Sequence, residues 1–164
     1  MGTLLVAYAS RHGSTREVAE AVAARLRERG HEVVIRPAAD VGELEPYGGV
    51  VLGGALYFGR LHRDAVAFLA RYESELAERP LAVFALGPKT AEPKDLAACR
   101  AQLDRALRKA PEPRAIAVFG GAIRPDELRF PFSRLPASDA RDWDAIEAWA
   151  DEVGEALQPA ENPQ

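Results

Sequence analysis

Residues 8–22 have the sequence YASRHGSTREVAEAV, and the type of fold can be inferred from them. An apolar run ends there in six small or polar residues, 10–15, and a helical pattern begins directly after them. A buried strand that runs through a short polar loop into a helix is the first unit of an alternating strand and helix fold.

Short apolar runs rich in Val, Leu, Ile and Phe recur along the rest of the chain. Polar and apolar residues do not alternate in them, as they would in a strand with one solvent-exposed face. Such unbroken apolar runs are typical of parallel strands buried on both faces. We therefore expect five buried strands, at residues 3–9, 31–35, 49–53, 81–86 and 115–119.

Segments of helical spacing separate these strands. Val18, Val22 and Leu26 share one helix face, and the following Gly30 is a residue type favoured just past a helix end. The second crossover, PAADVGELEPYG, leaves room for about one helical turn. Further helices are expected at residues 66–76, around Leu96, Leu103 and Leu107, and along a stripe of Trp143, Ile146, Ala150, Val153 and Leu157. The alternation predicts a doubly wound α/β sandwich, with helices on both faces and right-handed crossovers.

Length and composition bound the organisation of the chain. With 164 residues, 48% of them hydrophobic, we expect one domain over residues 1–157 and a disordered, Pro-rich tail at 158–164. A net charge of −4 gives no reason to expect nucleic acid or an anionic membrane surface as a partner. The single cysteine, Cys99, is expected to be inert core, and no metal site is expected.

Targeting signals are not evident in the sequence. The apolar start TLLVAYA is too short for a signal peptide and no basic run precedes it, while no segment approaches the length of a membrane span. We expect a cytoplasmic protein.

The loop at residues 10–15 is a candidate phosphate site, because ligands of doubly wound sheets bind at the carboxyl ends of the strands. SRHGST supplies three hydroxyls, one glycine and backbone N–H groups at a helix start, where the dipole favours negative charge. A three-glycine dinucleotide fingerprint and the Gly-Lys-Ser/Thr of a P-loop are both absent, which favours a monophosphate. The alternative is that Ser14 and Glu17 form a capping box that holds no ligand, and this stretch alone does not decide between the two.

A second loop, LGGALYFGRLHRD, places the adjacent aromatics Tyr57 and Phe58 between glycines directly after a buried strand. Exposed aromatics at this position would flank a flat ring. We expect Phe58 to fold back into the core and Tyr57 to contact a ligand.

Five motifs in order, YASRHGSTREVA, VVLGGALYFGRLHRDAVAFL, VFALGP, VFGGAI and RDWDAIEAWADEV, cover nearly the whole chain. Together they resemble the flavodoxin-domain group that includes the menaquinone-dependent protoporphyrinogen oxidases. The resemblance implies a flavodoxin-like five-stranded parallel sheet of order 2-1-3-4-5, and FMN as the cofactor.

The resemblance also assigns site residues by position. The phosphate falls to Ser10, His12, Gly13, Ser14 and Thr15, with Arg11 exposed beside it; the ring is bordered by Ala55, Leu56, Tyr57 and Gly59, and on its other side by Gly87, Pro88 and Lys89. The chain departs from the family where His12 replaces a small polar residue and where the loop GPKTAEPKD lacks an aromatic. The loop after the fifth strand is also shorter than in members acting on protoporphyrinogen, with a modest apolar patch at Phe130, Phe132 and Leu135.

Charges around the inferred site favour an enzyme over an acidic electron shuttle. Arg11, His12, Arg60, His62, Arg63, Lys89 and Lys94 stand there against Asp64, Glu92 and Asp95. This excess of positively charged side chains around the site would attract an anionic substrate. We therefore expect an FMN-dependent oxidoreductase acting on a small or flat organic acceptor, protoporphyrinogen oxidase-like or quinone-linked, with His62 passing a proton.

Three alternatives belong to other classes of protein. A one-electron transfer flavodoxin and a non-catalytic interaction module both stay open, and a homodimer is compatible with the sequence. The third, a signalling receiver, needs acidic residues at the ends of strands one and three. This chain has Ala9-Ser10 and Gly53-Gly54 there, so it lacks the chemistry of that class.

Overall fold

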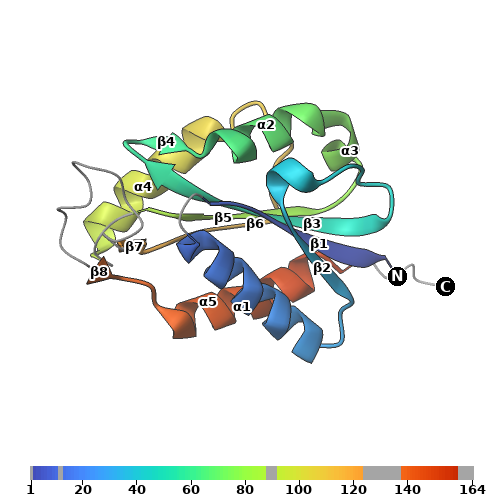
Figure 1. The fold of residues 1–164 in the computed structure, drawn as a ribbon, viewed down its shortest axis with the longest axis horizontal. Coiled ribbons are helices and arrows are strands. Elements are labelled where there is room, and N and C mark those ends of the chain that lie inside the picture. The colour runs from blue at the N-terminus through green and yellow to red at the C-terminus, as the bar shows by residue number, and fades with distance from the viewer. Residues whose placement is uncertain (1, 11–12, 88–91, 124–137, 159–164) are drawn as a thin grey trace.

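Five parallel strands form the central sheet of the computed structural model (Figure 1), which describes residues 2–10, 13–87, 92–123 and 138–158. The strands are β1 (Thr3–Ala9), β2 (Val33–Pro37), β3 (Tyr47–Tyr57), β5 (Leu81–Leu86) and β6 (Ala115–Phe119), in the order β2-β1-β3-β5-β6. Because β4 (Arg60–Leu61) only forms a hairpin with β3, this is the expected order 2-1-3-4-5. The expected doubly wound α/β fold is confirmed.

Helices cover both faces of this sheet. Figure 1 shows α1 (Ser14–Glu28) and α5 (Trp143–Ala156) on one face, with α2 (Arg63–Arg71), α3 (Glu73–Ala77) and α4 (Pro93–Ala106) on the other. The short second crossover contains only the 3₁₀ turn η1 (Ala38–Asp40), as its length predicts. A small separate sheet pairs β7 (Ala122–Ile123) with β8 (Ser138–Asp139) in antiparallel fashion.

The single helix expected at residues 66–76 is wrong, because the chain breaks at Tyr72 into α2 and α3. Tyr72 leaves helical geometry at φ −107° and ψ 23°, and its buried hydroxyl donates a 2.6 Å hydrogen bond to the carbonyl of Val41. A buried phenol needs such a partner, and reaching it fixes the position at which the helix is interrupted.

The core under α1 and α5 is built around an aromatic cluster. The rings of Phe84, Phe119 and Trp149 have centroids 5.7–6.2 Å apart, with Trp149 edge-on to both phenylalanines. Such tilted pairs add about 0.5–1.5 kcal/mol each beyond the area they bury. Gly53 in β3 is required there, because a Cβ at this position would overlap the ring of Phe84.

Trp143 was expected on the buried stripe of α5, and this expectation is wrong. It is the first residue of the helix and is 40% exposed, with its ring beneath the guanidinium of Arg141 at 4.9 Å. The buried residues of α5 are Ile146, Trp149, Ala150, Val153 and Gly154, and Leu157 just after the helix is also buried.

Two expected features lie outside the described residues: the apolar patch at Phe130, Phe132 and Leu135, and the tail beyond Gln158. Among the helices of the described segments, none is both long and apolar enough to cross a membrane.

Candidate functional site

The loops that follow β1, β3 and β5 meet at one edge of the sheet. Ala9 pairs in register with Gly54, and Ala55 pairs with Leu86, so the three strands end side by side. This register brings together the described members of the predicted site, namely Ser10, Gly13, Ser14, Thr15, Ala55, Leu56, Tyr57, Gly59 and Gly87. The predicted site residues Arg11, His12, Pro88 and Lys89 lie outside the described residues.

The loop before α1 is closed by its own backbone. Gly13 is the residue that precedes the helix, and its left-handed φ of 85° suits glycine. Its N–H donates to the hydroxyl oxygen of Ser10 at 3.1 Å, and its carbonyl accepts from the N–H of Glu17. The hydroxyl of Ser10 keeps its own hydrogen for donation to a ligand.

The capping-box alternative for Ser14 and Glu17 is wrong. Ser14 is the first helical residue, one position too late for a cap, and no side chain of the described segments caps the start of α1. The cap position belongs to Gly13, which has no side chain to contribute. The first backbone N–H groups of a helix have no partner within the helix, so they remain suited to an external acceptor.

Thr15, the second residue of α1, has a hydroxyl that nothing in the described structure satisfies. The residue is fully buried and its Oγ1 has no hydrogen-bond partner among the described residues. Leaving a buried hydroxyl unpaired costs about 1–3 kcal/mol. An orphaned donor beside the positive end of a helix fits an anionic group such as a phosphate.

The second loop is a β-hairpin, which the sequence analysis did not predict. β3 runs past its neighbours and turns back into β4 through Phe58 and Gly59, whose φ values are 49° and 79°. Two positive φ angles in a row match a two-residue hairpin turn, although phenylalanine is a rare choice for it. Leu61 anchors the returning strand, because a Cβ on Gly54 would lie only 2.8 Å from its Cδ1.

The expectation that Phe58 folds back into the core is wrong. Phe58 occupies the tip of the hairpin and is 86% exposed, while Tyr57 is 40% exposed. Ala55 and Leu56 are buried beneath them. The accessible part of this loop is therefore the segment from Tyr57 to Arg60.

His62 caps the N-terminus of α2. Its Nδ1 accepts a 3.0 Å hydrogen bond from the N–H of Asp64, and the side chain is 14% exposed. An Nδ1 that accepts carries no proton, so the neutral ring holds its hydrogen on Nε2. Any proton that His62 exchanges without breaking the cap must therefore pass through Nε2.

The third loop begins at Gly87, where α4 approaches the backbone closely. The N–H of Gly87 donates to the carbonyl of Phe119 at 3.1 Å, and a Cβ on Gly87 would lie 2.7 Å from the Sγ of Cys99. Burial raises the pKa of the Cys99 thiol, and the carboxylate of Asp95 raises it further. A thiol with a raised pKa is a poor nucleophile, in line with the expected packing role.

Sequence reasoning missed Arg141, which lies next to α1. Its guanidinium is held by both carboxylate oxygens of Asp139, and its Nη1 lies 3.4 Å from a carboxylate oxygen of Glu17. The hydrogen bond to Asp139 raises the pKa of Arg141 most, outweighing the effect of burial. The motif RDWDAIEAWADEV contains this arginine, but its spacing alone carries no signal for contact with a helix more than a hundred residues earlier.

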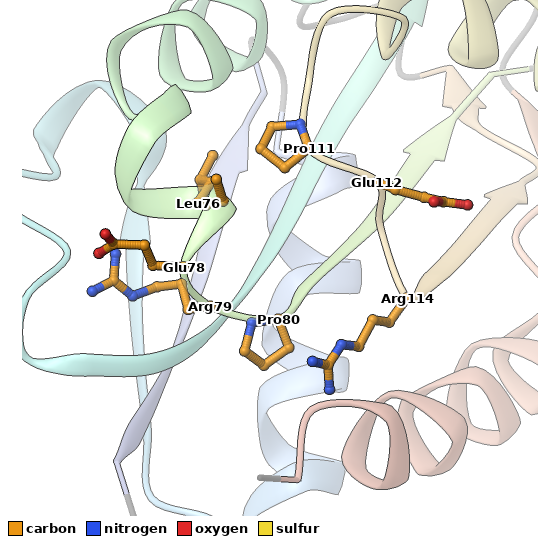
Figure 2. A pocket seen from close by; sticks show the side chains of 8 residues that line it. Leu76, Glu78, Arg79, Pro80, Pro111, Glu112 and Arg114 are labelled. Atoms are coloured by element: carbon orange, nitrogen blue, oxygen red, sulfur yellow. The ribbon is translucent and has the colours of Figure 1, made fainter. Parts of the chain in front are cut away.

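A pocket of about 270 Å³ lies at the opposite edge of the sheet, where Pro80 precedes β5 and Arg114 precedes β6 (Figure 2). Its arginines are already engaged. Arg79 donates to the carbonyls of Tyr47 and Glu75, and Arg114 donates to the carbonyl of Ala156. The described residues also contain no group of three His, Cys, Asp or Glu side chains placed to bind a metal ion.

Comparison with known sequences identifies one protein family. The sequence model described as a flavodoxin domain matches residues 5–134 of this chain. No curated protein matches.

Solved structures of low sequence identity share the fold. Oxidised Flavodoxin 1 from Bacillus cereus is 20% identical with a TM-score of 0.64, and the match covers 96% of this chain and 100% of that one. Flavodoxin from Fusobacterium nucleatum, solved bound to flavin mononucleotide, is 15% identical with a TM-score of 0.59, covering 96% and 100%. Rubredoxin oxygen:oxidoreductase from Desulfovibrio gigas is 16% identical with a TM-score of 0.57, and the match covers 96% of this chain but 36% of that larger one.

Proposed function

The chain belongs to the flavodoxin-domain family, and on that premise we propose that it binds FMN at the carboxyl edge of its sheet and takes part in electron transfer. The observation that carries the proposal is the fully buried hydroxyl of Thr15 at the start of α1, which has no hydrogen-bond partner among the described residues. When bound, FMN supplies the redox chemistry, while the protein supplies binding, orientation and electrostatics.

The phosphate of FMN would be held by the first turn of α1. The backbone N–H groups at the start of the helix and the hydroxyls of Ser14 and Thr15 donate to it, and the hydroxyl of Ser10 adds a further donor. Gly13 lets the ligand approach the backbone, since no atom of the described residues lies within 4 Å of the position its Cβ would take. Arg11 and His12 complete this loop by their place in the sequence.

The flavin ring would lie between the β3–β4 hairpin and the loop that follows β5. Tyr57 and Gly59 border it on the hairpin side, and Gly87, Pro88 and Lys89 on the other side, as the family resemblance implies. The exposure of Tyr57 and the side-by-side ends of β3 and β5 support this arrangement.

Visible absorption of the purified protein tests the choice of cofactor. We expect the flavin spectrum to shift when FMN is added to the apoprotein, and FAD to shift it far less, because the loop has no glycine fingerprint for a pyrophosphate. Equal shifts with FMN and FAD, or none with either, would contradict the proposal.

The reaction we propose is a two-electron step on a small or flat organic acceptor, either quinone-linked or of the protoporphyrinogen oxidase type. Support comes from the exposed aromatic tip of the hairpin and from the exposed cations Arg60, Arg63 and Lys94, which would attract an anionic substrate. The second candidate is one-electron transfer, which is favoured by the similarity to solved flavodoxins.

A redox titration of the FMN-loaded protein distinguishes the two reactions. We expect one two-electron wave, and turnover of a soluble quinone by the reduced protein. Two well-separated one-electron steps would instead establish the one-electron function, if the reduction potential of the second step lies far below that of free FMN.

His62 is the residue we propose to pass a proton in this reaction, through Nε2. His62→Asn keeps an oxygen that can accept from the N–H of Asp64, and therefore preserves the cap while removing proton transfer. His62→Ala removes both. We expect both variants to slow quinone turnover more than they weaken FMN binding; turnover by the asparagine variant equal to wild type would limit His62 to capping α2.

A further inference from the structure

We propose that Arg141 is a positioning residue, which holds the first turn of α1, with the phosphate-binding groups of Ser14 and Thr15, against the short β7–β8 sheet. The inference rests on the proposed function. Its side chain is only 5% exposed, although arginine is almost never buried unless its charge is paired. Such burial beside the proposed phosphate site calls for a specific role.

The guanidinium is oriented from its own segment of the chain. Its Nε and Nη2 donate to the two carboxylate oxygens of Asp139 at 2.9 and 2.7 Å, a paired geometry that fixes the plane of the group. The backbone N–H of Arg141 donates to the same carboxylate at 3.0 Å, and the ring of Trp143 packs against the cation at 4.9 Å. These contacts leave Nη1 as the atom that reaches another element.

That atom reaches the first turn of α1. Nη1 of Arg141 lies 3.4 Å from a carboxylate oxygen of Glu17, and it donates a long 3.5 Å hydrogen bond to the carbonyl of Ser14. Ser14 and Glu17 lie on either side of Thr15 in the sequence. If Arg141 changes position, the first turn of α1 and its groups proposed to bind phosphate are therefore expected to move with it.

The segment that carries Arg141 is itself tied to the end of β6. Asp139 pairs with Ala122 in the β7–β8 ladder, and the N–H of Ala140 donates to the carbonyl of Gly121 at 2.9 Å. The packing is close enough that a Cβ on Gly120 would overlap the carbonyl of Ala140. Among the described residues, Arg141 thus links the β7–β8 ladder to the first turn of α1.

Charge gives Arg141 a second effect at the same place. Glu17 is an acid in the first turn of α1, where a bound phosphate would bring further negative charge. The cation of Arg141 offsets the carboxylate of Glu17 at short range. Removing Arg141 would take away this positive charge beside the proposed phosphate site and leave the flavin ring unaffected.

The experiment compares FMN with riboflavin, which lacks the phosphate, on the apoprotein by calorimetry. We expect Arg141→Ala to weaken FMN about tenfold, equivalent to ~1.4 kcal/mol, and to change riboflavin affinity less than about twofold. Arg141→Lys keeps the charge but loses the paired geometry, so it should recover part of the FMN affinity.

The matched control is Arg25→Ala, which removes an arginine from the far end of α1, where it donates to both oxygens of Asp151. This variant should leave the ratio of FMN to riboflavin affinity unchanged. Urea unfolding of each apoprotein verifies that it is folded. If Arg141→Ala does not fold, the ratio of FMN to riboflavin affinity in Arg141→Lys tests the proposal.

Equal weakening of FMN and riboflavin, or the same loss of FMN affinity in the Arg25 variant, would overturn the positioning role while leaving FMN binding by the wild type intact. Failure of the wild type to bind FMN would overturn the proposed function and this role together.

Discussion

The two ends of α1 are built alike, yet within the described residues only the N-terminal end is left incomplete. At each end a glycine adopts a left-handed backbone, Gly13 at φ 85° and Gly30 at φ 93°. At each end an arginine also makes an ion pair between α1 and the region of α5: Arg25 with Asp151 at the C-terminal end, and Arg141 with Glu17 at the N-terminal end.

The difference lies in the polar groups that remain. At the C-terminal end Arg25 and Arg29 both donate to Asp151, and the backbone N–H groups that follow the helix bond back to its last carbonyls. At the N-terminal end the buried hydroxyl of Thr15 has no partner in the described structure. Buried polar groups are usually paired, so an end of a helix where one stays unpaired is a candidate for ligand binding.

Removing hydroxyls at the incomplete end should have the largest effect. Replacing both Ser14 and Thr15 with Ala is expected to weaken FMN by ~2–4 kcal/mol, at about 1–2 kcal/mol for each charge-assisted bond. Calorimetry measures this loss. Unchanged FMN affinity in the double variant would remove the functional distinction between the two ends.

The two glycines offer a matched pair of substitutions. At neither site does an atom of the described part of the chain lie within 4 Å of the position a Cβ would take, so alanine is expected to introduce backbone strain alone. Gly13→Ala and Gly30→Ala should each cost about 1–2 kcal/mol of unfolding free energy, measured with urea. Only Gly13→Ala should also weaken FMN; an equal loss of affinity in Gly30→Ala would mean that the ligand senses the whole helix.

Thr15→Val tests the orphaned hydroxyl directly, because valine keeps the shape and removes the polar atom. We expect the apoprotein to gain about 1 kcal/mol in unfolding free energy, since a buried unpaired hydroxyl is lost, while FMN binding weakens. A less stable apoprotein would show that the hydroxyl already has a partner in the unliganded fold.

The smallest effect concerns acid stability at the C-terminal end. Hydrogen bonds from Arg25 and Arg29 lower the pKa of Asp151 from 3.8 to about 2. Because the pKa is lower in the folded state, the stabilisation is present above pH 3.8 and is lost as the pH falls toward 2. The urea midpoint of unfolding, measured as a function of pH, should fall less steeply in this range for Asp151→Asn, whose FMN affinity should be unchanged. If the slope is the same as in the wild type, the acid dependence comes from other groups.

Much of the fold could be predicted from the sequence, because long apolar runs carry a clear signal. β1, β5 and β6 have the bounds expected for them, and the length of the second crossover limits it to one short turn. The loop before α1 was recognisable from its hydroxyls and from the helical pattern that follows. Family resemblance supplied the strand order and the cofactor.

Other features depend on contacts that no local pattern shows. β4 has only two residues, too few for a periodicity, and its turn uses Phe58 instead of the usual Asn or Gly. The break at Tyr72 depends on a carbonyl 31 residues away in sequence. Arg141 contacts the carbonyl of a residue 127 positions earlier, so only the folded chain reveals it.

We propose that the N-terminal end of α1 binds the phosphate of FMN. The most direct test is calorimetric titration of the wild-type apoprotein with FMN, riboflavin and FAD under identical conditions. We predict that FMN binds at about micromolar Kd or tighter, and that riboflavin and FAD each bind at least about tenfold more weakly. Riboflavin or FAD binding as tightly as FMN, or no binding of FMN at micromolar concentration, would contradict the account.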